Sequence, residues 1–451
     1  PMKKIIRLRT NASAPDALNG LHPVLAHIYA ARGVQSSNDL IRNLHGLHAP
    51  QLKGMEAALD LLEVALKEKQ RILVVGDFDA DGATSTVLAV LVLRAMGAVI
   101  DYLVPNRFTY GYGLTPEIVE LAHATKTPYL IVTVDNGISS LEGVAAANAL
   151  GMKVLVTDHH LPGAVLPEAA AILNPNQPGC VFLSKNLAGV GVVFYLLSCF
   201  RTRMKEQGWF TTMNIPEPAM ADYLDLVALG TVADVVPLDA NNRVLVHQGL
   251  NRIRAGRCRP GITALLDIAS KQPAQLVATD LGFQVAPRLN AAGRLDDMSQ
   301  GIECLLTGSV DLARQYASEL DGLNIERRQI EGSMQKEAMH VLQTFSLDKE
   351  ALPFGLTLFH RDWHQGVVGI LAGRLKERFH RPVIAFASSA PGSDELKGSA
   401  RSIPGVHIRD VLDTVAARNP GLITRFGGHA MAAGLTLPVA RLEAFRAAFN
   451  K

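Results

Sequence analysis

Short apolar runs, each followed directly by acidic residues, recur three times in the first half of the chain. They cover residues 71–76, 129–134 and 153–157, and all three are rich in Val, Ile and Leu. Strands of a parallel sheet that are buried on both faces read as continuous runs of this kind. The three runs therefore predict neighbouring strands of one parallel sheet.

Segments with helical spacing of apolar residues separate these runs. A further strand is predicted at 100–104. Regular alternation of strands and helices is typical of an α/β fold with a doubly wound parallel sheet. The helices that complete this alternation are predicted at 84–96, 115–124 and 141–150.

The pattern changes further along the chain. A long, charged helical stretch without proline covers 307–343 and predicts a connector between two domains. Beyond it a second α/β pattern begins, with strands at 356–359 and 382–386. We therefore predict a helical N-terminal region 1–70, a catalytic domain 71–305, a helical connector 306–350 and a smaller α/β domain 351–451.

Composition narrows the class of protein. With 451 residues, 48% hydrophobic and 19% charged, the chain can build two or three cores and is not of a disordered type. A net charge of +2 neither indicates nor excludes nucleic acid, so an anion-binding surface must be local. Four scattered cysteines without a Cys-x-x-Cys pair suggest reduced thiols in a cytoplasmic protein. We expect no leader and no membrane association, because no apolar run reaches about 18 residues.

Acidic residues and histidines gather at the ends of the three predicted strands. Sites in open α/β sheets form beyond the carboxyl ends of the strands, and carboxylates this close repel each other unless cations lie between them. Carboxylates with an imidazole suit Mn²⁺ or Mg²⁺, and two ions about 3.5–4 Å apart serve phosphodiester hydrolysis. The residues concerned are Asp77, Asp79, Asp81, Asp135, Asp158, His159 and His160.

A plainer interpretation is that the first three aspartates form only a turn and a helix cap. That interpretation leaves the acids after the second and third strands unexplained. Four motifs and four later segments then occur in a fixed order along the chain. They are 77–82, 134–137, 158–160 and 230–238, followed by 287–294, 363–369, 398–402 and 427–429.

In this order the motifs resemble those of the DHH phosphoesterases, and within them the bacterial exonuclease branch that acts on single strands. The resemblance covers essentially the whole chain. It implies a DHH domain joined by the long helix to a smaller α/β DHHA1 domain, with the active site between them. Many relatives carry histidine at the position of Val75, and Asp77 is expected to compensate. The metal ligands implied by motif position are Asp79, Asp81, Asp135, His159 and Asp234, with Asp77 as a further candidate.

The resemblance also implies a reaction. Asp81, Asp135 and His160 are expected to carry catalysis, with His160 as charge stabiliser or proton donor at the scissile phosphate. Family members degrade single-stranded DNA from its 5′ end to mononucleotides with Mn²⁺ or Mg²⁺, in repair and recombination. We expect a monomer, with a helicase and a single-strand-binding protein as candidate partners. Exonucleases of this branch usually continue into an OB-fold, which we expect to lie outside this chain.

Cationic and aromatic residues are candidates for binding the strand. Arginine can contact phosphate with two parallel hydrogen bonds, and a serine hydroxyl can complete an anion pocket. Each arginine could instead form a structural salt bridge, and His364 and His429 could be structural histidines. Phe108, Tyr110 and Tyr112 could stack on bases. The candidate phosphate-binding residues are Arg107, Arg288, Arg294, Ser399, Arg401 and His429.

Two other functions stay open from the sequence. A DHH phosphodiesterase of short oligonucleotides or cyclic dinucleotides would share the site, although such relatives are usually shorter. A non-catalytic replication scaffold that binds single strands would share the fold, but such relatives typically lose ligands. A series of substrates of increasing length separates the first alternative from the exonuclease, and the filled ligand positions argue against the second.

Overall fold

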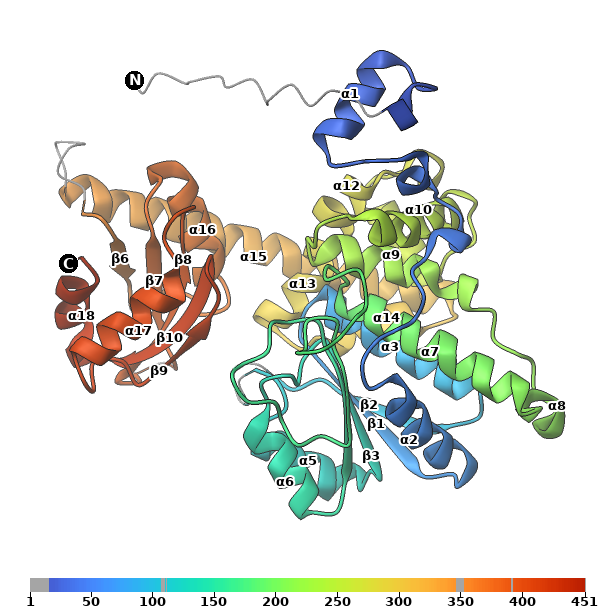
Figure 1. Cartoon of the computed structure of the whole chain (residues 1–451). Coiled ribbons are helices and arrows are strands. Elements are labelled where there is room, and N and C mark those ends of the chain that lie inside the picture. The colour runs from blue at the N-terminus through green and yellow to red at the C-terminus, as the bar shows by residue number, and fades with distance from the viewer. Residues whose placement is uncertain (1–15, 107–109, 111, 346–352, 391, 451) are drawn as a thin grey trace. The chain divides into compact units, whose positions relative to one another are not determined.

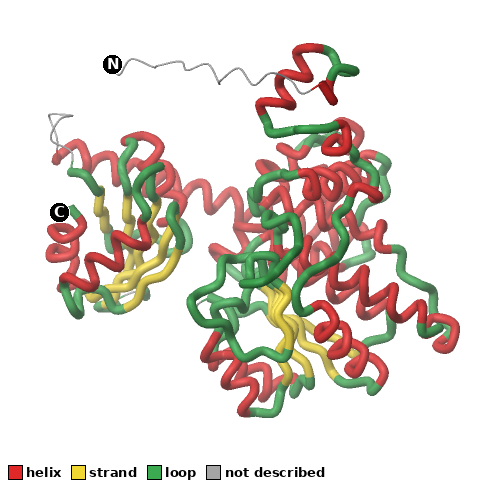
Figure 2. The backbone as a smooth tube through the Cα atoms, in the orientation of Figure 1, coloured by secondary structure: helices red, strands yellow, loops and turns green. Residues whose placement is uncertain are grey.

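The computed structural model describes residues 16–106, 110, 112–345, 353–390 and 392–450. The chain divides into two compact units, Pro1–Asp321 and Gly322–Lys451, and each is described here by itself. Figure 1 labels their elements and Figure 2 distinguishes helices, strands and loops along the backbone.

The first unit is built on a five-stranded sheet with the order β2-β1-β3-β4-β5, in which all neighbouring strands are parallel. The chain leaves β1 toward one edge of the sheet and returns to the other side of β1 as β3. A crevice opens at such a switch in strand order, beyond the carboxyl ends of the strands. The strands are β1 (Arg71–Gly76), β2 (Val99–Leu103), β3 (Leu130–Val134), β4 (Lys153–Thr157) and β5 (Ala171–Leu173).

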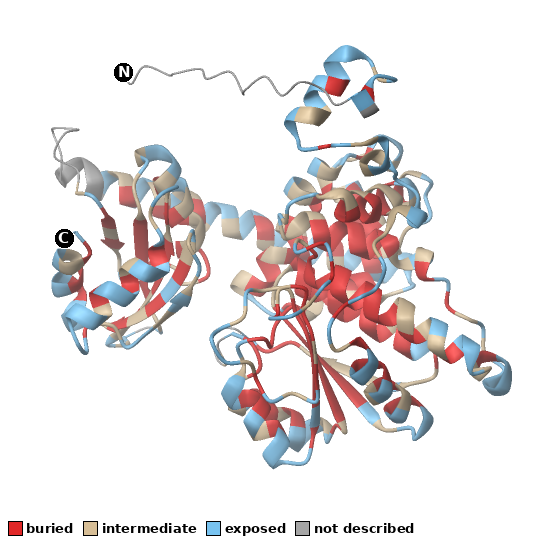
Figure 3. Cartoon of the chain, in the orientation of Figure 1, coloured by how far each residue is buried: buried red, intermediate tan, exposed pale blue. Residues whose placement is uncertain are grey.

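Helices cover both faces of this sheet (Figure 1), which confirms the doubly wound α/β fold. Leu73 and Val75 of β1 point to the face covered by α5 and α6 and share a core with Ile118 and Val144. The other face is covered by α3 and α7, and α3 is buried almost all round. Figure 3 shows that the strands of the sheet and the helices beside them are largely buried. The four helices are α3 (Ala80–Ala95), α5 (Pro116–Lys126), α6 (Leu141–Ala149) and α7 (Gly189–Glu206).

Further helices complete the first unit. The small helix α1 packs over Leu18 and Val34 in a separate apolar cluster. The helices other than α1 surround α3 and α7 or extend from them. The further helices are α1 (Pro23–Ala31), α2 (Met55–Lys67), α8 (Trp209–Met213), α9 (Leu224–Ala233), α10 (Ala240–Arg254), α11 (Pro260–Ile268), α12 (Ala278–Asp280), α13 (Ala286–Leu295) and α14 (Ser299–Leu306).

The second unit contains a five-stranded mixed sheet with the order β6-β7-β8-β10-β9, in which only β6 and β7 are parallel. α17 and α18 pack on one face through Leu412 and Phe445, and α16 packs against β7 and β8. The elements are β6 (Leu356–Phe359), α16 (Val368–Phe379), β7 (Val383–Ser388), β8 (Glu395–Arg401), α17 (Ile408–Arg418), β9 (Arg425–Gly428), β10 (Ala432–Pro438) and α18 (Leu442–Phe449).

The long helix α15 (Val310–Phe345) contributes to both units. In the first unit, Asp321 pairs with the buried Arg288 at 2.8 Å. In the second unit, Glu331 accepts from Arg327 at 2.7 Å and from Arg374 of α16 at 3.1 Å. The residues of the helix up to Asp321 thus belong to the first unit, and those from Gly322 on belong to the second. The boundaries predicted at residues 70, 305 and 350 stay predictions.

One predicted helix begins earlier than expected. The sequence suggested a start at Thr84, but α3 begins at Ala80 because the carboxylate of Asp79 accepts from the amides of Asp81 and Gly82, both at 3.0 Å. The cap lies inside the acidic motif itself, so Asp81 sits in the first helical turn.

Two simpler observations concern the whole described chain. Its four cysteines are unpaired, and none of its helices is long and apolar enough to cross a membrane.

Candidate metal centre

Three aspartates lie at the same level of the first sheet. Gly76 pairs in register with Val134, and Val134 pairs with Thr157, so the residues that follow them are equivalent positions on three adjacent strands. Those next residues are Asp77, Asp135 and Asp158, and all three are buried. Parallel strands that end together thus place three carboxylates side by side at the switch point, as the sequence predicted.

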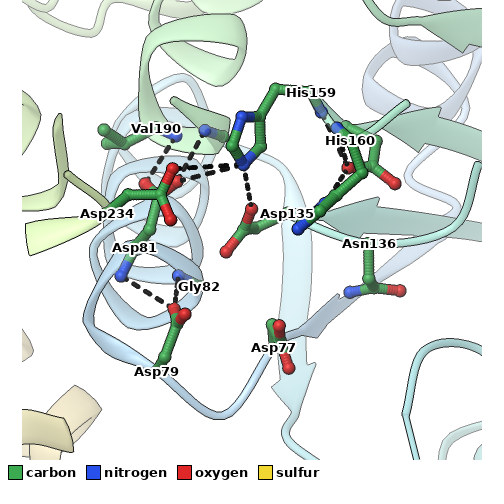
Figure 4. Close-up of polar contacts among 12 residues, drawn as sticks. Asp77, Asp79, Asp81, Gly82, Asp135, Asn136, His159, His160, Val190 and Asp234 are labelled. Carbon is green, nitrogen blue, oxygen red and sulfur yellow. Dashed lines mark hydrogen bonds and ion pairs between the residues drawn. The ribbon is translucent and has the colours of Figure 1, made fainter. Parts of the chain in front are cut away.

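Asp81 is held by the start of another helix. Its two carboxylate oxygens accept from the amides of Gly189 at 2.6 Å and Val190 at 2.9 Å, in the first turn of α7 (Figure 4). Free amides and the positive end of the helix dipole stabilise a negative charge there. Nothing in the sequence signals this contact, because the partners are more than a hundred residues apart.

His159 points toward three carboxylates (Figure 4). Its Nε2 lies 3.1 Å from Asp135 Oδ1, 3.4 Å from Asp234 Oδ2 and 3.9 Å from Asp81 Oδ2. The short contact to Asp135 does not have hydrogen-bond geometry, and both atoms are buried without a hydrogen-bond partner. A buried donor set of this kind is stabilised by a positive charge bound between its members, and without one by protonation of its acids. The site therefore fits a cation.

All six predicted ligands fall into groups that could hold an ion. In each group one ligand atom per residue lies within 4.8 Å of the others. The first two groups both contain His159, and the third lies on the Asp77 side of the site. The groups are Asp81, His159 and Asp234; Asp135, His159 and His160; and Asp77, Asp79 and Asp135.

The electrostatics of these acids follow from burial and crowding. Burial raises the pKa of Asp81 to about 7 and that of Asp234 to about 9, and nearby carboxylates add to both shifts. For the same reasons the pKa of Asp135 lies well above its ordinary value. Burial and the charge of His160 lower the pKa of His159 to about 4, so its ring is neutral, as a metal ligand must be. A bound cation would bring all three acids to their charged form.

His160 is held differently from His159. Its Nδ1 lies 2.7 Å from Oδ1 of the buried Asp158, which also accepts from the amides of His159 and His160. Burial alone would lower the pKa of His160, but the hydrogen bond and charge of Asp158 outweigh it and raise that pKa to about 9. Its ring is thus oriented by a carboxylate that no cation group includes, which suits a proton donor.

Two site residues occupy strained backbone. Asp135 has φ +61°, and Val235, which follows the ligand Asp234, also has φ +61°. A β-branched residue in this region is a genuine outlier, and Val235 is also 84% exposed. Strain of this kind persists where the surrounding contacts impose it, and it clusters at functional sites.

Comparison with protein families assigns the two units. Residues 71–231 match the DHH family, N-terminal domain, and residues 352–451 match the DHHA1 domain. The chain is 56% identical to the single-stranded-DNA-specific exonuclease RecJ of Dickeya dadantii, over 99% of this chain and 78% of that protein. The chain belongs to the RecJ family. The same exonuclease of Escherichia coli is also 56% identical, over 100% of this chain and 78% of that protein.

Solved RecJ structures share the fold and contain metal. A crystal structure of exonuclease RecJ bound to manganese matches with a TM-score of 0.73 at 34% identity, over 89% of this chain and 95% of that one. RecJ of Thermus thermophilus in complex with Mn²⁺ matches with a TM-score of 0.79 at 33% identity, over 98% of this chain and 60% of that one. Together with the unpartnered Asp135 and His159 atoms, these matches identify Mn²⁺ or Mg²⁺ as the cofactor of this RecJ-family chain.

Helix α13 packs against the loop before α3, which carries the acids of the first motif. Asn290 of α13 accepts from the amide of Ala80 at 2.8 Å, which adds a second cap to α3. One turn further on, Gly293 packs so closely that a Cβ there would lie 1.7 Å from the carbonyl oxygen of Phe78. The 287–294 motif of the RecJ family therefore buttresses the acidic loop, and its glycine is required by close backbone approach.

This close contact predicts opposite effects for two helical glycines. Gly293→Ala should lower activity by at least tenfold and reduce the melting temperature, because the loop bearing Asp79 must move. Gly322→Ala on α15 is the matched control: its Cβ would meet nothing within 4 Å, and alanine should stabilise the helix by about 0.5–1 kcal/mol. Initial rates and thermal melting of both variants test this, and equal behaviour would contradict the buttress.

Three predicted arginines of the first unit fall in different places. Arg288 is buried, pairs with Asp321 and donates to the carbonyl of Gln284, so its contacts are structural. Arg294 lies in the last turn of α13 and is partly buried. Arg107 lies outside the described residues. Arg288 of α13 is therefore placed to hold α15 against α13. The pattern of charges along the chain did not reveal this contact.

The predicted anion-binding residues of the second unit share one end of its sheet. Arg401 donates to Ser399 Oγ at 3.1 Å and to the carbonyl of Ala400 at 2.9 Å, and no carboxylate among the described residues pairs with it. Burial lowers the pKa of this guanidinium. Arg401 pairs in register with Ala432, whose carbonyl accepts from the amide of His429. A partly buried guanidinium without an acidic partner is suited to an anion.

His364 lies in another motif of the second unit. Its Nδ1 accepts from the amide of Gly366 at 3.1 Å, within the turn that precedes α16. This contact belongs to the turn itself, and the choice between a structural and a phosphate-binding role of His364 stays a prediction.

The three candidate stacking residues also differ in their surroundings. Tyr110 packs against the core under α5 and α6. Tyr112 is 52% exposed, and its ring lies edge-on to Phe78 at 5.9 Å and to His160 at 6.2 Å. Phe108 lies outside the described residues. Tyr112 is therefore the described aromatic of this segment that borders the metal centre.

Proposed function

We propose that this chain is a metal-dependent exonuclease that degrades single-stranded DNA from the 5′ end to 5′-mononucleotides. The observation that supports this most directly is the convergence of five acids and two histidines at the switch point of a RecJ-family fold. Phosphodiester hydrolysis at two divalent ions needs such a set of oxygen and imidazole ligands.

Each part of the site has a role in this proposal. Bound divalent ions would polarise the phosphate and activate a water molecule. The residues that would hold them are Asp77, Asp79, Asp81, Asp135, His159 and Asp234. His160, oriented by Asp158, faces the scissile phosphate and gives a proton to the leaving 3′ oxygen. The O–P bond to water forms as the P–O3′ bond breaks, so the terminal nucleotide leaves and the next one gains a 5′-phosphate.

Selectivity for the 5′ end is proposed to come from the second unit. Arg401, Ser399 and His429 would bind the terminal 5′-phosphate, and Arg294 and Arg107 would contact the strand. The support is the partly buried guanidinium of Arg401, which no carboxylate among the described residues pairs with and which can contact a phosphate with two parallel hydrogen bonds.

Arg401→Ala should therefore discriminate between ends. Activity on 5′-phosphorylated strands should fall about 10- to 100-fold, because a charge-assisted hydrogen bond contributes about 1.5–3 kcal/mol. Strands with a 5′-hydroxyl should be affected less. The test compares digestion rates on 5′-phosphorylated and 5′-hydroxyl strands, with the substitution of an exposed arginine, Arg361→Ala, as control. An equal loss on both ends would make Arg401 a general backbone contact.

The whole proposal is tested by digestion of DNA labelled at either end, in Mn²⁺, with a double-stranded control. Early release of the 5′-terminal mononucleotide from single strands only is the expected result. Turnover of di- or trinucleotides without digestion of long strands would move the protein to the small-substrate phosphodiesterases. Binding of strands without hydrolysis would favour the scaffold.

Partners and location form the remaining part of the proposal. We propose a cytoplasmic monomer that acts in repair and recombination with a helicase and a single-strand-binding protein. The four unpaired cysteines are consistent with a reducing compartment. Size-exclusion chromatography with light scattering tests the monomer, and pull-down with purified partners tests the contacts.

A further inference from the structure

The turn that follows β5 contacts the main chain of both motif histidines. Asn176 Nδ2 donates to the carbonyl oxygen of His159 at 2.7 Å, and Asn174 Nδ2 donates to that of His160 at 2.9 Å. Asn174 is fully buried and Asn176 is partly buried. Two side-chain amides, two residues apart, thus hold two consecutive carbonyl groups.

These contacts replace a strand ladder that has just ended. The β4–β5 pairing continues to the bond from the Asp158 amide to the Leu173 carbonyl. Beyond it, Pro175 has no amide hydrogen and the chain turns away, so the backbone cannot pair further. The two asparagines supply the missing donors from their side chains, at the point where the ladder would otherwise leave the histidine carbonyls unpaired.

The turn itself is firmly held. Asn174 Oδ1 accepts from the Asn176 amide at 2.7 Å, which closes an Asx-turn. Lys185 Nζ donates to the Pro175 carbonyl at 2.6 Å. Gln177 Nε2 donates to the carbonyls of Ile172 at 2.8 Å and Lys53 at 3.1 Å. Because these contacts fix the turn, the side chains of Asn174 and Asn176 can fix the carbonyl groups to which they donate.

The position of the histidine backbone matters because the metal-facing ring extends from it. The His159 ring hydrogen-bonds the main chain of Leu187, while its Nε2 is buried without a hydrogen-bond partner and points at the carboxylates. Where that nitrogen lies is set by the Leu187 contact and by the backbone of His159. Residues that orient a ligand in this way typically change metal affinity or activity 10- to 100-fold when removed.

We propose that Asn174 and Asn176 are positioning residues of the metal centre: Asn176 sets His159 for metal binding, and Asn174 sets His160 for proton transfer. Neither touches the substrate or the ion. The His159 half concerns metal binding alone, whereas the His160 half rests on the function proposed above.

The first test is Mn²⁺ binding by isothermal titration calorimetry, which needs no substrate. Asn176→Ala removes only the donor to His159 and Lys185, and it should weaken Mn²⁺ binding about 10- to 100-fold. Gln177→Ala is the matched control, because it loosens the same turn without touching either histidine. It should lower the melting temperature and leave Mn²⁺ affinity within about threefold. Asn176→Asp, which keeps the size and removes the donor, replaces the alanine variant if that variant does not fold.

The second test separates the two asparagines. Asn174→Ala removes the donor to His160 and also the acceptor that fixes Asn176. It should therefore weaken Mn²⁺ binding as Asn176→Ala does, and in addition lower the single-turnover rate on 5′-phosphorylated strands at saturating Mn²⁺ by at least tenfold. Asn176→Ala should regain most of its rate at saturating Mn²⁺.

Several results would overturn the inference. Unchanged Mn²⁺ affinity in Asn176→Ala, or an equal loss in Gln177→Ala, would reduce the turn to a general structural element. A rate of Asn174→Ala that recovers fully at saturating Mn²⁺ would remove the His160 role. Failure of the exonuclease proposal is recognised separately, since the unsubstituted protein would then bind Mn²⁺ but not digest single strands.

Discussion

Asp135→Asn should nearly abolish activity while making the metal-free protein more stable. Asparagine tolerates the left-handed backbone at this position, so the fold is preserved. The substitution removes one buried carboxylate from a crowded group, which relieves repulsion without metal and removes a ligand with it. We expect a rate loss of about 10³-fold or more, since metal-assisted stabilisation of the transition state is worth several kcal/mol.

Rates in Mn²⁺ and melting temperatures with and without Mn²⁺ check both halves of this expectation. The variant should melt at a higher temperature than the parent without metal, and gain less when Mn²⁺ is added. Asp101→Asn is the control, because Asp101 is a partly exposed partner of Lys126 whose loss should cost less than about 1 kcal/mol. An Asp135→Asn enzyme with near-normal rates would remove Asp135 from the ligand set.

His160→Ala is expected to lower the rate about 10²- to 10⁴-fold at saturating Mn²⁺, the range for loss of a general acid. Asp158 would keep its amide donors from Ile138 and His159, so the loop should stay folded. Mn²⁺ affinity, measured by calorimetry, should stay within a few-fold.

The geometry also permits His160 to share an ion with Asp135 and His159. Mn²⁺ affinity decides between the two roles, because a ligand would cost binding and a proton donor would cost rate alone. Leu161→Ala, at the exposed neighbouring position, is the control and should behave like the parent.

The convergence of the acids could be predicted because it depends on a local rule. Asp77, Asp135 and Asp158 each follow the last residue of a parallel strand, and such strands end at one edge of the sheet. Asp234 comes from the end of α9, and only family resemblance pointed to it. A helix end carries no signal that says which strand it will face.

The supporting residues could not be predicted, since their roles arise from packing across long separations. Asn290 caps a helix that begins 210 residues earlier, and Gly293 is required only because Phe78 passes beside it. Arg288 was predicted to bind phosphate because its charge is visible in the sequence while its burial against Asp321 is not. Asn174 and Asn176 are typical turn residues, and that pattern does not reveal their contacts to the histidine carbonyls.

The buttress formed by α13 has a consequence for how the protein is made. The acidic loop near residue 80 leaves the ribosome long before Gly293, and its helix cap is incomplete until Asn290 arrives. Synthesis at about 5–20 residues per second makes this delay roughly 10–40 s. During this time the strands can pair, but α13 does not yet support the metal centre. The nascent chain thus acquires its affinity for metal late, when most of the first unit has already been synthesised.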